Sequence, residues 1–413
     1  MSKRAKALLG AFVAVVAAGT ASSAVADAGS GIRLGGSDGR LHPSLEVESR
    51  SDSNVIYWTP GQSVSDVILH IRPGLTLTVP GELTAVDLHA ALDWAQYLGV
   101  EGHTSDLSRL YGDASLGIGV NRRGQLGLEL NDDFFRRSNT SVMSFGTAVI
   151  ANNNALRVAM PWKPGGGALL LTLGGEWELE TYEPYATPTL CGTGELICEP
   201  GLVSKFGWNE LRGTGELKWK FLPRTAVVLD GSYFSRLAND NVYSPDLSGF
   251  RTEAGLTGLV TQRIAGTVKA GYGQTFGNEA LRTWLANAEF EWLATETSAA
   301  RVGFSHDYGT DPGWILSLFQ SNRVYVDGHV LLGGRFTARL GASLERREYE
   351  SVAAHATLFR IEPAFEAEVT RAFRAVLGYA YTDRASNVPA GTLGLPGYNY
   401  SKNEFWLRGV VSY

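Results

Sequence analysis

The final segment of the chain constrains the fold most, because its side chains alternate between two kinds over residues 403–413. A β-strand points successive side chains to opposite faces, so a period of two indicates a strand. In a membrane β-barrel one face of each strand meets lipid and the other meets a polar lumen. The sequence therefore predicts a barrel strand whose two faces are Phe405, Leu407, Gly409, Val411 and Tyr413 against Glu404, Trp406, Arg408, Val410 and Ser412.

The beginning of the chain carries the features of an export signal. Residues 2–6, Ser-Lys-Arg-Ala-Lys, form a basic segment, and residues 8–18 form an apolar run. Ala24-Val25-Ala26 then forms a small-residue cleavage site before Asp27. This order is typical of a secretory signal peptide, and the apolar run is shorter than the roughly 20 residues of a membrane helix. We expect a signal peptide at 1–26, a short periplasmic lead at 27–40 and a barrel at 41–413. The terminal aromatic Tyr413 resembles the signal read by barrel-assembly machinery, an expected partner.

The connections between predicted strands are of two alternating kinds. Short ones, such as residues 80–82 and 222–224, interleave with mostly longer polar ones, such as residues 51–66 and 183–205. Outer-membrane barrels have short periplasmic turns and longer outer loops, and those of bacteria have an even number of strands. We predict an all-β, antiparallel transmembrane barrel of about 18 strands in the outer membrane, in contact with its lipid.

Charge argues against nucleic acid as a partner. The whole chain has 36 basic and 42 acidic residues, and loss of the predicted signal peptide removes Lys3, Arg4 and Lys6 but no acid. A nucleic-acid-binding surface is normally basic. The acidic balance of the exported chain therefore favours another function.

The two cysteines, Cys191 and Cys198, lie close together in a segment rich in Pro, Gly and Thr. Exported proteins meet an oxidising environment, in which nearby cysteines commonly form a disulfide. A metal site would need further ligands, and no histidine lies nearby in the sequence. We expect a disulfide that closes part of a long loop, and no metal.

The charged positions of the predicted strands form the candidate functional set. A charge on the lipid face is destabilising, by about 2 to 4 kcal/mol for Arg or Lys at the midplane, so the charged face of each strand should point inward. The residues predicted to line the lumen are Asp87, His89, Asp93, Glu129, Glu176, Glu178, Glu180, Arg212, Glu216, Lys218, Arg301, Arg339, Arg360, Glu362, Glu366, Arg374 and Arg408. We also expect Arg339, Arg360, Arg374 and Arg408 to form cross-strand ion pairs with Glu362 and Glu366.

The sequence contains none of the common catalytic or cofactor-binding motifs considered below. The 7 histidines form no H-E-x-x-H, and the sequence has no G-x-S-x-G. The paired glycines Gly117/Gly119 and Gly271/Gly273 lie in predicted strands, without the helix that a nucleotide site needs. His89 between Asp87 and Asp93 could act as a base, but spacing alone cannot assemble a catalytic site across strands. We expect no enzyme activity and no cofactor.

The first predicted hairpin resembles that of a known family. Residues 66–77, Asp-Val-Ile-Leu-His-Ile-Arg-Pro-Gly-Leu-Thr-Leu, are followed by a tight turn into residues 83–97. A long polar first loop, a strand with Pro73-Gly74 and a run of hairpins to an aromatic terminus are similar to the family known as “Putative β-barrel porin 2”. The resemblance covers residues 41–413 and carries no catalytic residues with it.

This resemblance implies a function in secretion. Members of the family are similar to barrels that pass exopolysaccharide out of the cell together with polysaccharide-export lipoproteins. The chain has no helical-repeat periplasmic region, so the resemblance implies a separate periplasmic partner, either such a lipoprotein or another transport complex. A general or substrate-specific porin for small polar solutes is the alternative, and a surface receptor or an outer-membrane enzyme are further ones.

Overall fold

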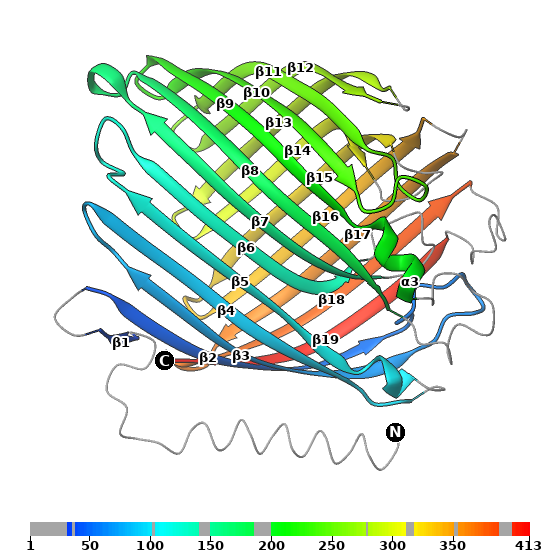
Figure 1. The fold of residues 1–413 in the computed structure, drawn as a ribbon. Coiled ribbons are helices and arrows are strands. Elements are labelled where there is room, and N and C mark those ends of the chain that lie inside the picture. The colour runs from blue at the N-terminus through cyan, green and yellow to red at the C-terminus, as the bar shows by residue number, and fades with distance from the viewer. Residues whose placement is uncertain are drawn as a thin grey trace.

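The last strand closes the molecule onto the first long one. In the computed structural model, β19 (Tyr400–Ser412) pairs antiparallel with β2 (Arg40–Asp52) from Glu404 opposite Asp52 to Ser412 opposite Ser44. Every other strand from β2 onward pairs antiparallel with its sequence neighbours, so β2 to β19 form a closed barrel of 18 strands (Figure 1). The predicted fold class is thereby confirmed.

The structure describes residues 31–34, 38–100, 104–139, 149–185, 200–277, 280–310, 318–350, 354–387 and 399–413. The predicted signal peptide and the predicted disulfide between Cys191 and Cys198 lie outside these residues. The remaining strands are β1 (Ile32–Arg33), β3 (Asp66–Val79), β4 (Thr84–Tyr97), β5 (Arg109–Val120), β6 (Leu128–Asn139), β7 (Val149–Trp162), β8 (Leu169–Pro184), β9 (Trp208–Leu222), β10 (Thr225–Ala238), β11 (Leu247–Leu259), β12 (Ile264–Phe276), β13 (Arg282–Thr295), β14 (Ser298–Thr310), β15 (Leu318–Leu332), β16 (Phe336–Tyr349), β17 (Ala354–Glu368) and β18 (Phe373–Ser386).

The two ends of the barrel differ. Short turns, such as Pro223-Arg224 between β9 and β10, join the strands at the end that carries β1 and the C-terminus, on the left of Figure 1. Mostly longer connections occupy the other end, with the short helices η1 (Thr104–Leu107), α3 (Pro200–Val203) and η5 (Ser204–Phe206), while η3 (Pro164–Gly166) lies in a turn. We call these the turn end and the loop end. Among the described residues, no helix has the length and apolarity needed to cross a membrane.

Alternation along each strand produces an apolar outer face. On β9, for example, Leu211 is 63% exposed and Trp219 is 53% exposed, whereas Glu210, directly before Leu211, is 1% exposed. An apolar side chain this exposed in a barrel strand is in contact with lipid. Large aromatic side chains near the turn end, including Trp162, Trp219 and Trp292, are about half exposed, as expected for the aromatic belt at a membrane interface.

Candidate functional site

The inner face of the barrel is identified by contacts between strands that are not neighbours. Arg251 on β11 donates from Nη1 to Oδ2 of Asp307 on β14 at 2.9 Å, and Arg236 on β10 donates to the hydroxyl of Thr310, also on β14. Side chains on the convex surface of a barrel diverge, so strands this far apart can touch only on the concave side. The face that carries the charged side chains is therefore the interior.

A network of ion pairs lines the interior where the barrel closes. Glu48 on β2 is fully buried and accepts hydrogen bonds from Arg50 at 2.8 Å and from Arg408 on β19 at 2.7 Å. Arg50 also donates to Glu404 at 3.0 Å. A buried charge is tolerated when several partners satisfy it. These contacts join β19 and β2 through side chains as well as through the backbone.

A second part of this network holds the first loop, residues 53–65. Lys402, which is 3% exposed, lies with its Nζ 2.7 Å from Oδ2 of Asp52 and donates to the hydroxyl of Tyr57 at 2.6 Å. Asn54 donates to the backbone oxygens of Trp58 and Ser401. Burial raises the pKa of Tyr57 to about 12, since the charged phenolate is disfavoured away from water. The first loop is thus anchored to the closing strand.

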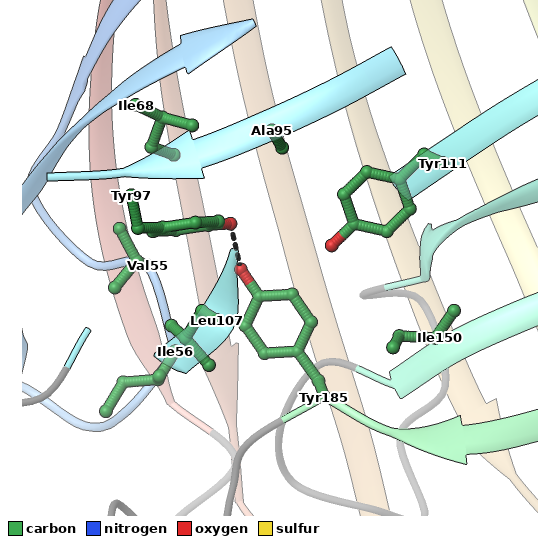
Figure 2. Close-up of a cluster of buried hydrophobic side chains, with 9 residues drawn as sticks. All are labelled: Val55, Ile56, Ile68, Ala95, Tyr97, Leu107, Tyr111, Ile150 and Tyr185. Atoms are coloured by element: carbon green, nitrogen blue, oxygen red, sulfur yellow. Dashed lines mark hydrogen bonds between the residues drawn. The ribbon is translucent and has the colours of Figure 1, made fainter. Parts of the chain in front are cut away.

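An apolar cluster covers the inner surface of β3 to β5 at the loop end (Figure 2). Val55 and Ile56 of the first loop and Leu107 of η1 pack there, each 1% exposed or less. The hydroxyls of Tyr97, at the end of β4, and Tyr185, just after β8, are 2.5 Å apart. Burial also raises the pKa of Tyr185 well above its usual value. These loop residues form a fixed lining on one side of the barrel mouth.

Acidic side chains concentrate on the wall formed by β6 to β9. Arg157 on β7 donates to Asp133 at 2.6 Å and to Glu176 at 2.8 Å. The amide of Asn153 donates to Glu178 at 2.7 Å and to Glu180 at 3.2 Å. These three glutamates of β8 thus lie in one row, with a single arginine and one amide as the partners that bind them from β7.

The opposite wall contains several predicted ion pairs. Arg339 on β16 and Arg374 on β18 both lie 3.3 Å from Glu366 on β17, as expected for cross-strand pairs. Arg360 differs from the expectation, because it lies 2.6 Å from Glu362 on its own strand, β17. Arg408 was expected beside Glu362 and Glu366, but it bonds to Glu48 and lies 3.4 Å from Glu46 on β2. The reason is closure: β19 has β2 as its second neighbour, and the carboxylates of β2 are closer than those of β17.

Asp87, His89 and Asp93 of β4, which suggested a catalytic base, lie beside different residues. His89 lies 3.1 Å from Asp113 on β5, whereas Asp93 bonds to His70 at 2.9 Å and lies 3.0 Å from Arg72, both on β3. Asp87 is opposite Gly117 of β5. No single site gathers all three residues. The remaining predicted positions form the pairs Glu129–Arg122 at 3.7 Å, Glu216–Lys218 at 2.8 Å, Arg212–Glu210 at 2.5 Å and Arg301–Glu289 at 3.9 Å.

Much of the network where the barrel closes could not be predicted from the sequence. Glu46, Glu48 and Arg50 lie at alternate positions of β2, and Leu45 and Val47 beside the two glutamates gave a usable signal of alternation. Asp52 was assigned to a loop, but β2 continues to it. Nothing in the sequence marks Lys402 as buried. Within the described part of the chain, no group of three or more His, Cys, Asp or Glu side chains is arranged to hold a metal ion.

The profile of the family described as “Putative beta-barrel porin 2” matches residues 28–407. The chain belongs to this family. It is an outer-membrane β-barrel of the porin type, in agreement with the closed, lipid-facing fold. No curated protein matches the chain.

Solved structures with a similar fold include three proteins of Pseudomonas aeruginosa. The siderophore receptor PirA is 10% identical, with 91% of this chain and 80% of that chain covered, at a TM-score of 0.47. The outer membrane protein OpdK is 10% identical over 90% of this chain and 99% of that chain, at a TM-score of 0.48. OccK3 (OpdO) is 12% identical over 90% and 95%, respectively, at 0.45.

Proposed function

We propose that this porin passes exopolysaccharide across the outer membrane and that it does so as a passage, without catalysis. The observation that supports this most directly is the pairing of charges on the inner face, such as Arg157 between Asp133 and Glu176, or Arg374 and Arg339 around Glu366. Paired charges largely neutralise one another yet remain strongly hydrated. A wall of this kind offers many weak hydrogen bonds to a hydroxyl-rich polysaccharide but no site that would bind it tightly.

The residues predicted from the sequence to line the lumen belong to this proposal. Glu176, Glu178 and Glu180 would contact the polymer on one side, and Arg339, Arg360 and Arg374 on the other. A periplasmic polysaccharide-export lipoprotein or transport complex would deliver the polymer to the turn end. Energy would come from synthesis and inner-membrane transport, since a passage needs no nucleotide site of its own.

Diffusion of small polar solutes is the second candidate function. The apolar cluster at the loop end favours it, because Val55, Ile56 and Leu107 occupy one side of the barrel mouth. A narrowed mouth suits a small solute better than a polymer. This alternative predicts conductance in a planar bilayer without any partner protein.

The first test is a clean deletion strain, complemented with the intact gene and scored for cell-surface polysaccharide. Loss of surface polymer with continued synthesis is the expected result, preferably with polymer retained inside the envelope. Unchanged surface polymer in the deletion strain would exclude export of that polymer. Conductance of the purified barrel in a planar bilayer would then test the small-solute alternative.

A matched pair of cysteine variants tests whether the polymer travels through the barrel. Ser343 and Leu344 are neighbours on β16, and Leu344 is 49% exposed on the outer face. We expect a bulky maleimide on Ser343→Cys to block export in whole cells. The same reagent on Leu344→Cys serves as the control and should leave export unchanged. Equal export from both labelled variants would contradict passage through the lumen.

A further inference from the structure

Most aromatic side chains on the inner face of the described barrel strands are buried. The inner face follows from the register, because residues paired across neighbouring strands share a face. Trp208 on β9 and Trp406 on β19, for example, are each 5% exposed. Tyr325 and Phe135 are partly exposed instead. Arg137 lies over the ring of Phe135, with its guanidinium carbon 4.0 Å from the ring centroid, so Tyr325 has the more open ring.

Tyr325 lies near the middle of β15, and its side chain extends across one neighbouring strand to the next. Its hydroxyl donates to Oε2 of Glu289 on β13. Between them lies Gly303 of β14, which is paired with Glu289 on one side and with Tyr325 on the other. Neighbouring strands are about 4.8 Å apart, so a side chain that reaches a residue two strands away must lie along the wall.

Gly303 provides the space in which this ring lies. A Cβ at this position would overlap the ring of Tyr325, and Gly303 is buried although it faces the lumen. A glycine in a strand often allows such a close approach, and an aromatic side chain often covers it. One face of the Tyr325 ring therefore rests on Gly303, and the other face is turned toward the lumen.

Two charged side chains flank the ring along β15. Arg323 and Asp327, the inward residues on either side of Tyr325, are both exposed. The guanidinium carbon of Arg323 lies 5.5 Å from the ring centroid. Among the described residues, nearby Arg301 and Arg339 are in ion pairs with carboxylates, whereas neither Arg323 nor Asp327 is. An exposed ring thus lies between one donor group and one acceptor group that can bind a solute.

The wall beside the ring on the β16 side carries small residues. Ser343 is paired with Tyr325, and Gly341 is paired with Asp327. A Cβ added at Gly341 would meet only Oδ2 of Asp327 within 4 Å, at 3.8 Å. Small residues at these two positions leave access to the ring from the lumen.

We propose that Tyr325 is a stacking site for one sugar ring of a saccharide in the lumen, with Arg323 and Asp327 as hydrogen-bonding partners of its hydroxyl groups. This inference rests on the proposed passage of a saccharide through the barrel. The C–H groups on the face of a pyranose ring carry partial positive charge, and the face of an aromatic ring is negative. A guanidinium can donate two hydrogen bonds to neighbouring hydroxyls, and a carboxylate can accept two.

The charges favour an uncharged sugar, because Arg323 and Asp327 are of opposite sign and lie on either side of the same ring. A single aromatic ring with two hydrogen-bonding groups binds weakly. A polymer can therefore advance by exchanging one sugar unit for the next at this position. The site guides the chain and adds no strong barrier to its movement.

Saturation-transfer NMR with maltohexaose, an uncharged oligosaccharide, tests the site. The mature protein is extracted from outer membranes in a detergent without a sugar headgroup, and the dissociation constant is obtained by titration. We expect saturable binding by the wild type and a dissociation constant about fivefold higher for Tyr325→Leu. Tyr325→Phe keeps the ring and should bind more tightly than Tyr325→Leu. Tyr233→Leu, at a tyrosine that is 54% exposed on the outer face, is the control and should bind like the wild type.

Gly303→Ala tests the position of the ring without removing any group that could bind the sugar. The added methyl group displaces the Tyr325 ring, so we expect weaker binding of maltohexaose. Gly231→Ala on the outer face of β10 is the matched control, because a Cβ there would meet no atom closer than 3.5 Å. Polyethylene glycol of similar length has no sugar ring and should give the same signal with the wild type and with Tyr325→Leu. Heat-dependent gel mobility verifies that each variant is folded.

Absence of saturable binding by the wild type would overturn the proposal. Equal dissociation constants for the wild type and Tyr325→Leu, or for Tyr325→Phe and Tyr325→Leu, would do the same. The assay uses the purified barrel, so its failure is distinguishable from failure of the export proposal. Surface polymer lost on deletion, with no binding that depends on Tyr325, would retain export and exclude this site. Binding that depends on Tyr325, with unchanged surface polymer in the deletion strain, would retain the site and exclude export of that polymer.

Discussion

The side-chain nitrogen of Lys402 lies 2.7 Å from Oδ2 of Asp52, and both side chains are almost completely buried where β19 meets β2. Lys402 comes from the end of the chain and Asp52 from its beginning, so this ion pair exists only in the closed barrel. The same lysine donates to Tyr57, and the contact therefore also holds the first loop.

Removing Lys402 should destabilise the barrel strongly. The variant Lys402→Met leaves Asp52 and Glu404 without this partner, and breaking a buried pair on one side typically lowers the free energy of unfolding by about 3 to 5 kcal/mol. Urea unfolding followed by tryptophan fluorescence measures the change. Lys220→Met, at an exposed lysine of β9, is the control and should change stability by no more than about 0.5 kcal/mol.

A double variant separates the loss of the pair from the loss of lysine packing. In Asp52→Leu with Lys402→Met neither of these two charges remains, so we expect it to be more stable than Lys402→Met alone. Equal unfolding midpoints for Lys402→Met and the wild type would show that the pair contributes nothing to stability.

Alkaline pH should weaken the barrel partly through Tyr57. Its pKa is raised to about 12 by burial in the folded state, compared with about 10 in an unfolded chain. The folded state thus holds the phenolic proton more tightly. This contribution is fully present below pH about 10 and is lost as the pH rises toward about 12.

The variant Tyr57→Phe tests this assignment, because it removes the titrating group. Over this pH range the free energy of unfolding of the variant should fall less steeply than that of the wild type. The difference between the two slopes against pH should approach the value for one bound proton per molecule. The measurement is urea unfolding at a series of pH values. Parallel curves for the two proteins would assign the alkaline loss to other groups.

The first loop should limit the flow of ions through the barrel. Replacing residues 55–64 with a short Gly-Ser linker removes Val55 and Ile56 from the inner surface at the loop end. We expect a larger single-channel conductance in a planar bilayer. A matched replacement of residues 240–245, in the connection between β10 and β11, is the control. An unchanged conductance after the first replacement would show that the loop does not line the narrowest part.

The acidic row of β8 should favour cations. In the triple variant Glu176→Gln, Glu178→Gln, Glu180→Gln, the wall opposite the arginines of β16 to β18 loses negative charge, and the ratio of potassium to chloride permeability should fall. The reversal potential in a KCl gradient measures this ratio. Glu183→Gln is the control, because Glu183 lies on the same strand but on the outer face, paired with Arg136. A ratio that responds equally to both variants would contradict the assignment.

Strands and their faces could be predicted where alternation is regular. The expected strand over residues 335–349 appears as β16 (Phe336–Tyr349), with Leu340 and Leu344 exposed on its outer face. On β6 the sequence Asp132-Asp133-Phe134-Phe135 places like residues side by side, and local alternation does not distinguish the faces. There the register with β5 and β7 decides that Asp133 is inside and Asp132 outside.

The sequence by itself determined the approximate number of strands, their order and the charged face of most of them, because these depend on a local period of two. The alternation of turns with loops could also be predicted, from the length and polarity of the connections. Only the tertiary structure decided the pairing partners: Arg408 with Glu48, Lys402 with Asp52, and Tyr97 with Tyr185. These contacts join residues far apart in the chain. Closure and register bring them together, and a local period contains no information about either.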